Sequence, residues 1–110
     1  MKIVNLTPHA ITVIYGNRER TFPSDGVARV SVCENEIGNI DGIPLVQTLY
    51  GKVEGLPDPK PDTVYIVSYA VLNALKNTYR TDCVAPNTGP KGAIRNEAGQ
   101  IIATRGFQAL

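Results

Sequence analysis

The sequence predicts a small α+β domain with a mostly antiparallel β-sheet and one helix packed on it. Short apolar segments separated by turn residues recur along most of the chain, which is typical of strands. One later segment instead has apolar residues at helical spacing. The length of 110 residues suits one hydrophobic core, so residues 1–110 are expected to form a single domain.

The first half of the chain predicts four strands separated by turn residues: Lys2–Leu6, Ala10–Tyr15, Arg18–Phe22 and Val27–Cys33. Gly16-Asn17 is a good hairpin turn between the second and the third strand. In the fourth strand, Ala28, Val30 and Val32 alternate with Val27, Arg29, Ser31 and Cys33, as is typical of a half-buried strand. The segment Glu34–Pro44 that follows is rich in acids and glycines, so we expect a loop there.

The second half predicts further strands at Leu45–Glu54, interrupted at Gly51, and at Thr63–Val67, with a last hairpin formed by Ala93–Arg95 and Gln100–Thr104. Three prolines between residues 55 and 62 indicate an exposed connection. Thr63–Val67 is the most apolar segment and is expected to be central. Six to eight short strands are therefore expected in all.

The only convincing helix runs from Ser68 to Asn77. Ser68 is a favourable N-cap residue, because its hydroxyl can accept a hydrogen bond from the first helical turn. The apolar stripe expected to face the sheet that contains Val64 and Ile66 consists of Ala70, Val71, Ala74 and Leu75.

The charge balance argues against non-specific nucleic-acid binding, which needs a basic excess. Eleven basic residues stand against ten acidic ones, for a net charge of +1. No apolar run approaches the roughly 20 residues of a membrane span, so no membrane association is expected. The N-terminus turns polar too early for a signal peptide, and we expect the protein in the cytoplasm of the cell that makes it.

Neither a metal site nor a catalytic constellation is expected. The chain has one histidine, His9, and two cysteines, Cys33 and Cys83, with no CxxC pair. The two thiols are expected to be free, and no cofactor is predicted. The carboxylates are scattered among loops, without a pair spaced for acid–base catalysis.

The loop after the helix offers the best candidates for a binding site. Arg80 presents a fork suited to phosphate or carboxylate, and Asp82 could accept from a ribose hydroxyl or a base amine. The alternative is structural: Arg80 favours the helix C-terminus and pairs with Asp82. Asn87 and Thr88 open a Gly/Pro-rich stretch that is either a lid over a ligand or a bare loop.

Arg95 and Arg105 sit on the two strands of the last hairpin and could converge with Arg80 on an anion. The ordinary alternative is solvated charge at a sheet edge. Tyr69 and Tyr79 could stack on a base or lie at the rim of the core. If these arginines do not bind, the next place to look is the group Arg18, Arg20 and Arg29.

Thr7 and His9 flank a proline and form a tight corner. Either they hydrogen-bond a ligand at the wall of a cleft, or the imidazole only pins the corner. A small nucleotide-processing enzyme with His9 as its base is a third possible function.

Four blocks of the sequence together resemble a family of short proteins, of about this length, encoded by bacteriophages and prophages. They are NLTPHAI at 5–11, EGLPDPKPDTVYIVS at 54–68, RTDCVAP at 80–86 and AIRNEAGQIIATRGF at 93–107. The resemblance covers most of the chain outside the stretch from about Gly16 to Pro44. It brings no established catalytic residue with it.

The resemblance implies a setting in an infected bacterium, where small accessory phage proteins inhibit host defence, regulate or join the virion. The first hypothesis is an anti-defence protein that sequesters a nucleotide-derived immune signal without cleaving it, as a homo-oligomer. The alternative is a protein–protein inhibitor or minor structural protein of the phage, bound through an exposed sheet edge.

Overall fold

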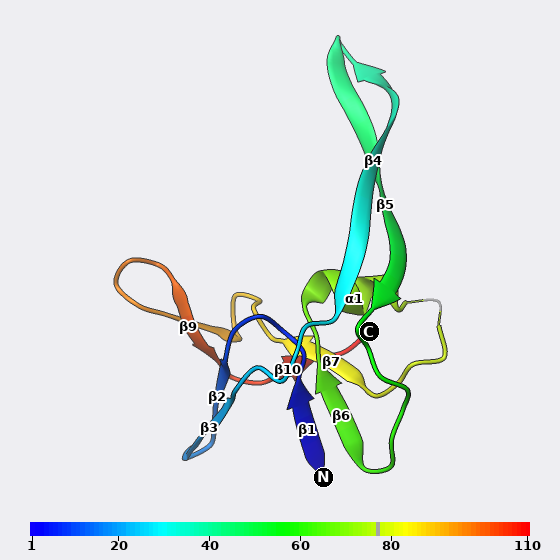
Figure 1. Ribbon diagram of the computed structural model, residues 1–110. Coiled ribbons are helices and arrows are strands. Elements are labelled where there is room, and N and C mark those ends of the chain that lie inside the picture. Colours follow the sequence, from blue (N-terminus) through cyan, green and yellow to red (C-terminus); the bar gives the residue numbers. More distant parts are fainter. Residues whose placement is uncertain (77) are drawn as a thin grey trace.

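The computed structural model describes residues 1–76 and 78–110, in which ten strands and one short helix form (Figure 1). The elements are β1 Lys2–Asn5, β2 Ile11–Tyr15, β3 Arg18–Phe22, β4 Arg29–Ile40, β5 Ile43–Glu54, β6 Thr63–Ile66, α1 Tyr69–Ala74, β7 Cys83–Pro86, β8 Ala93–Arg95, β9 Ile101–Thr104 and β10 Phe107–Gln108. Strands take up 51% of the residues, so the fold is richer in sheet than a balanced α+β domain.

The strands form two four-stranded mixed sheets and a separate two-stranded ribbon. The first sheet has the order β1-β6-β7-β10 and the second the order β3-β2-β9-β8. Strand β6 pairs in parallel with both β1 and β7, which confirms the central place expected for Thr63–Val67. Strand β2 also pairs in parallel with β9. Parallel pairs need long crossover connections, and the chain supplies one in the segment that holds α1.

Helix α1 covers the first sheet, and its N-terminal half follows the sequence closely. The Ser68 hydroxyl accepts a hydrogen bond from the Val71 N–H at 3.3 Å, as expected of an N-cap. The helix ends at Ala74, with Leu75 as its C-cap, and is shorter than predicted. The predicted end at Asn77 lies outside the described residues.

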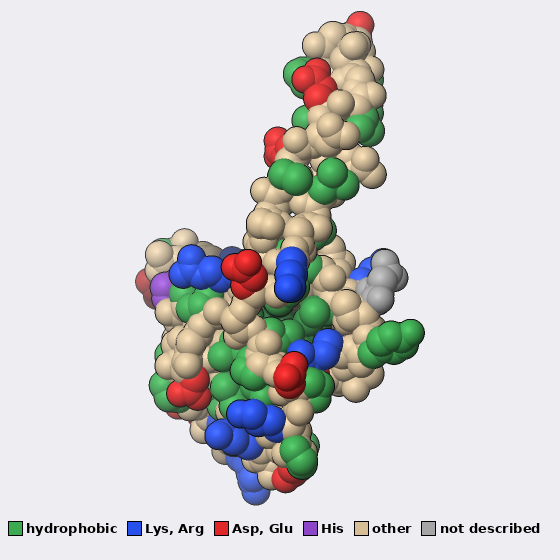
Figure 2. Space-filling model, turned by 45° about the vertical axis from the view of Figure 1, so that its right-hand side comes forward, with side chains coloured by type: hydrophobic (Ala, Val, Ile, Leu, Met, Phe, Trp, Pro, Cys, Tyr) green, Lys and Arg blue, Asp and Glu red, His purple; other side chains and the backbone are tan. Residues whose placement is uncertain are grey.

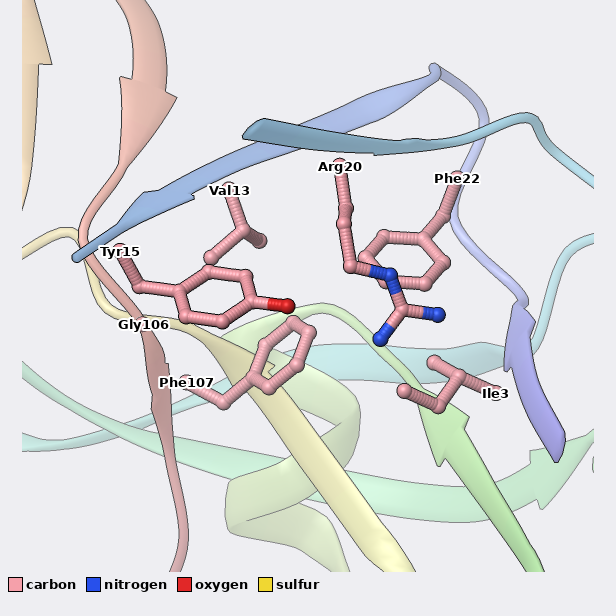
Figure 3. A pocket seen from close by; sticks show the side chains of 7 residues that line it. All are labelled: Ile3, Val13, Tyr15, Arg20, Phe22, Gly106 and Phe107. Carbon is pink, nitrogen blue, oxygen red and sulfur yellow. The ribbon is translucent and has the colours of Figure 1, made fainter. Parts of the chain in front are cut away.

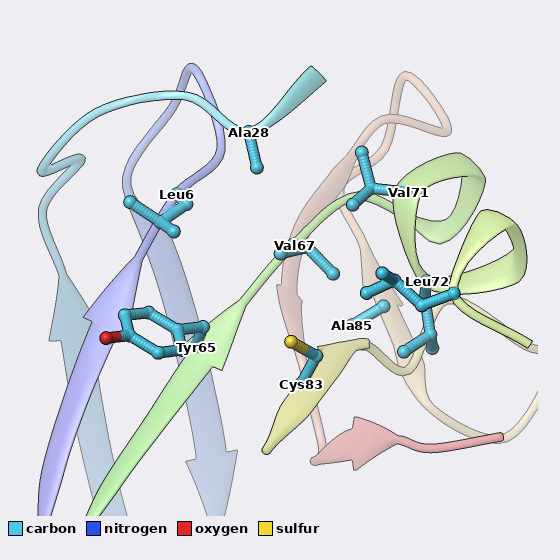
Figure 4. Close-up of a cluster of buried hydrophobic side chains, with 9 residues drawn as sticks. Leu6, Ala28, Tyr65, Val67, Val71, Leu72, Cys83 and Ala85 are labelled. Atoms are coloured by element: carbon cyan, nitrogen blue, oxygen red, sulfur yellow. The ribbon is translucent and has the colours of Figure 1, made fainter. Parts of the chain in front are cut away.

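The buried residues of this region are Val71, Leu72 and Leu75 from the helix segment and Tyr65, Val67, Cys83 and Ala85 from the sheet (Figure 4). The predicted burial of Leu75 is confirmed, whereas Leu72 was missed and Ala70 and Ala74 are only half-buried. The helix packs on the expected sheet but meets the face with Tyr65. Since side chains alternate along a strand, Ile66 points to the opposite face and packs with Val13 and Phe22.

Strands β4 and β5 form a long hairpin that projects from the rest of the molecule, here named the arm (residues 29–54; Figure 1). The loop predicted over Glu34–Pro44 is therefore wrong: all but two of its residues continue the strands. The chain reverses at Asp41 and Gly42, both with positive φ (53° and 80°), as a two-residue primed hairpin turn requires. An Asp-Gly pair between apolar residues was the signal that could have revealed this hairpin.

The half-buried strand expected over Val27–Cys33 is also wrong beyond Val30. At the base of the arm, Val30 and Val53 pack against the core of the first sheet. From Ser31 outward every residue of β4 is exposed, because the ribbon leaves the body and no segment among the described residues covers it. We call the remaining described residues, 1–28 and 55–110 without residue 77, the body.

Candidate functional site

An apolar pocket of about 220 Å³ lies where the two mixed sheets meet (Figure 3). We call it the phenylalanine pocket; its lining comes from β1, β2, β3 and the segment around β10 and consists of Ile3, Val13, Tyr15, Arg20, Phe22, Gly106 and Phe107. The rings of Phe22 and Phe107 pack against each other in its wall, with centroids 6.1 Å apart and planes tilted by 51°. Residues from opposite ends of the chain therefore build one cavity.

The β2–β3 hairpin explains how this wall is assembled. Its register places Val13 opposite Arg20 and Tyr15 opposite Arg18. Cross-strand partners and residues two apart share a face, so Val13, Tyr15, Arg20 and Phe22 all project to the same side of the hairpin. The Gly16-Asn17 turn, predicted from the sequence, fixes that register.

Arg20 supplies the charge of the pocket. Its guanidinium carbon lies 4.9 Å from the centroid of the Phe22 ring, within the range of a cation–π contact. Arg20 takes part in neither of the two ion pairs found in residues 1–76 and 78–110. Figure 3 shows its guanidinium and the Tyr15 hydroxyl on the same side of the cavity. The pocket thus combines apolar walls with a cation and a hydroxyl at its mouth.

Arg80 and Asp82, the first predicted site residues, bind each other. Arg80 Nε and Nη2 donate to the two carboxylate oxygens of Asp82 at 2.9 and 3.0 Å. The hydrogen bonds from Arg80 lower the pKa of Asp82 and raise that of Arg80. Burial, together with the Asp82 charge, raises the pKa of the neighbouring Cys83 thiol to about 11. This is the pairing that the sequence offered as the structural alternative.

Asn87, Thr88 and Arg105 lie in two segments that the fold brings side by side. The Asn87 N–H donates to the Gly106 carbonyl at 2.9 Å, and Asn87 Oδ1 accepts from the Gly89 N–H. Arg105 donates to the carbonyl oxygens of Lys91 and Ala93, at 3.2 and 3.3 Å. Its guanidinium therefore already braces this loop.

Arg95 and the two tyrosines occupy separate positions. Arg95 donates to the Gly99 carbonyl within its own hairpin. Arg95 is the last residue of β8 and Arg105 follows β9 in the second sheet, whereas Arg80 precedes β7 of the first sheet. Tyr69 and Tyr79 are exposed. Arg80 thus lies beside the first sheet, whereas the other two arginines lie in or beside the second.

The corner with Thr7 and His9 is organised by a buried amide that the sequence analysis missed. Asn5 donates to the carbonyl oxygens of His9 (2.8 Å) and Phe22 (2.9 Å), and its Oδ1 accepts from the backbone N–H of Thr7 (2.9 Å). The Thr7 hydroxyl lies 2.7 Å from Asn5 Oδ1 and is buried. The His9 side chain is exposed. An asparagine closing an apolar strand just before a proline corner was the available signal.

Comparison with known proteins gives no relative: no family model, curated protein or solved structure matches the chain. Within the described residues, no group of three or more histidine, cysteine or acidic side chains could hold a metal ion. The described helix is too short to cross a membrane.

Proposed function

We propose that the protein binds, without chemical conversion, a small ligand that joins a planar ring to an anionic group, as a nucleotide does. The observation that carries this proposal is the position of Arg20 over the Phe22 ring at the mouth of the phenylalanine pocket. An arginine beside an apolar cavity offers charge to a phosphate and a stacking surface to a ring.

The size of the pocket defines how such a ligand would sit. At about 220 Å³ it is smaller than the roughly 300–1,000 Å³ of sites that enclose a drug-sized ligand. It therefore suits a single ring placed against the wall that Phe22 and Phe107 form together, with the sugar and phosphate outside. Arg20 would then meet the phosphate, and the Tyr15 hydroxyl would donate to a ligand oxygen.

The residues that line the pocket favour capture of the ligand over its conversion. The lining holds no carboxylate, histidine or cysteine that could act as a general base or an activated nucleophile. The resemblance to phage-encoded proteins makes a nucleotide-derived immune signal the first ligand class to test. Sequestration of that signal in the cytoplasm of an infected bacterium is the role we propose.

The test is calorimetric titration of the purified protein with cyclic nucleotides and ADP-ribose-type nucleotides, followed by recovery of the bound ligand after denaturation. Intact ligand is expected. Arg20→Ala should weaken binding at least ~10-fold, because a charge-assisted hydrogen bond contributes about 1.5–3 kcal/mol. Arg95→Ala, an exposed arginine outside the pocket, is the matched control and should keep full affinity.

Three results would contradict the proposal. Altered ligand would make the protein an enzyme, and failure to bind any nucleotide would exclude the ligand class. Loss of affinity in the Arg80, Arg95 or Arg105 alanine variants, with Arg20→Ala unaffected, would move the site to the loop that the sequence first suggested.

A further inference from the structure

The arm carries a large apolar surface that the described residues leave uncovered. Eight large apolar side chains on it are between 39% and 67% exposed: Val32, Ile37, Ile40, Ile43, Leu45, Val46, Leu49 and Tyr50. Monomeric proteins rarely expose a contiguous apolar surface of this kind, and a lone two-stranded ribbon is marginal in water. Figure 2 shows apolar and acidic side chains along the projecting part and basic ones close to where it joins the body.

The two faces of the arm differ in charge. The register pairs Cys33 with Leu49, Asn35 with Gln47 and Ile40 with Ile43. Because side chains alternate along β5, these pairs share one face with Leu45. That set, Cys33, Asn35, Ile40, Ile43, Leu45, Gln47 and Leu49, contains no charged residue, and we call it the uncharged face. The opposite face carries Glu34 and Glu36 beside Val32, Val46 and Tyr50.

Charge also changes along the length of the arm. The middle and the tip of the arm carry the acids Glu34, Glu36 and Asp41. Both basic residues of the arm, Arg29 and Lys52, lie at its base, together with the one remaining acid, Glu54. Arg29 also lines a groove of about 460 Å³ at the base, between the Pro8 corner and α1.

We propose that the arm is a self-association element, and that its uncharged face is covered by the same face of a second copy, with the two arms antiparallel. In this arrangement a twofold axis crosses the middle of the arms, so the tip of each arm lies at the base of the other. Asp41 of one copy then approaches Arg29 of its partner, and the apolar tip reaches the partner's base groove. A parallel arrangement would instead place acid beside acid.

The expected strength of this dimer follows from its area. Twelve-residue strands span about 40 Å, and a two-stranded ribbon presents on the order of 400 Å² of face per copy. Two faces together bury on the order of 800 Å², less than the roughly 1,000 Å² of a specific interface, and the contacts of each tip with the partner's base supply the remainder. We therefore expect a dimer that dissociates on dilution, rather than an obligate one.

The first test measures mass by light scattering across a concentration series. The wild-type protein is expected to pass from one to two chain masses as its concentration rises. Leu45→Glu, on the uncharged face, should remain at one chain mass throughout. Val46→Glu is the matched control: the two neighbours are 39% and 42% exposed, but Val46 points to the opposite face, so its variant should still dimerise. Unchanged circular dichroism in both variants verifies folding.

The second test addresses the antiparallel order. Asp41→Lys and Arg29→Glu should each weaken the homodimer, because like charges would meet at both ends. An equimolar mixture of the two variants should restore the dimer, since each lysine then faces a glutamate. A chain with Asp41→Lys carries the same strain in its turn whether it is measured alone or in the mixture. Recovery of the dimer in the mixture therefore reports the charge pairing and not the strain.

The exposed thiol of Cys33 provides an independent readout. Its rate of reaction with a disulfide reagent should fall as the dimer forms and stay high in Leu45→Glu. Buried Cys83 should remain slow in both, since its pKa is raised to about 11. A wild-type protein that stays at one chain mass at every concentration overturns the proposal. Equal loss of the dimer in Leu45→Glu and Val46→Glu overturns the assigned face. A mixture of Asp41→Lys and Arg29→Glu that dimerises no more tightly than either variant alone overturns the antiparallel order.

Discussion

The body and the arm contain strands of similar sequence, but the body buries their apolar side chains and the arm exposes them. In the body, apolar side chains such as Ile66 and Val67 are completely buried, whereas the arm leaves side chains of the same kind in solvent. Buried polar groups of the body, such as Asn5, have partners within the chain. The difference teaches that strand formation needs only local pairing, whereas stability needs a second layer, which the described residues do not provide for the arm.

The largest effect should separate a body leucine from an arm leucine. Leu75→Ala should lower the free energy of unfolding by about 2–5 kcal/mol, because it leaves a cavity beside Leu72 and Cys83. Leu49→Ala, measured where the protein is monomeric, should cost well under 1 kcal/mol, because Leu49 is 43% exposed while Leu75 is 6% exposed. Urea denaturation measures both, and equal losses would break the distinction between body and arm.

A smaller effect should distinguish two asparagines. Asn5→Ala removes the donor to two backbone carbonyls and should destabilise the body by about 1–3 kcal/mol, the cost of buried polar groups left without partners. Asn39 in the arm makes an exposed hydrogen bond to the Gly42 N–H, so Asn39→Ala should cost a few tenths of a kcal/mol at most. Thermal melting of both variants tests this, and a benign Asn5→Ala would mean that the corner is held by other contacts.

The smallest effect concerns pH, and it comes from the body. The folded pKa of Asp82 lies below its ordinary value of 3.8, so its stabilisation is complete above that pH and is lost as pH falls through the lowered value. The folded pKa of Cys83 is raised from 9.0 to about 11, so the neutral thiol stabilises the fold below pH 9 and this contribution is lost between about pH 9 and 11.

Denaturation of the wild type and of Asp82→Asn at pH values from 2 to 11 checks both signs. The stability difference between the two proteins should vanish at low pH, where Asp82 is protonated. Cys83→Ser should remove part of the decline above pH 9. A wild-type profile that rises with pH in that range would contradict the assignment to Cys83.

Local signals in the sequence predicted much of the body. Ser68 as N-cap, the Gly16-Asn17 hairpin and the last hairpin were all found, because caps and tight turns depend on residues close in the chain. The short strands β7 and β10 escaped prediction. β10 has two residues, which is too few for a pattern of alternation.

The candidate site was harder to predict than the fold. The arginines favoured by the sequence flank a Gly/Pro-rich loop, which is a local feature, but Arg80 is paired with Asp82 and Arg105 braces the backbone. Arg20 lies at a pocket only because Phe107, from the other end of the chain, completes the wall beside the β2–β3 hairpin. No local rule connects residues that far apart in the chain.

The sequence by itself determined the short strands other than β7 and β10, the capped helix, the buried Leu75 and the presence of only one histidine and two cysteines, since each depends on residue type or on spacing within a few positions. Only the tertiary structure decided the parallel pairing of β1 with β6 and of β2 with β9, the phenylalanine pocket and the exposure of the arm. Alternation shows which side chains share a face, but what covers that face depends on distant parts of the chain or on a second molecule.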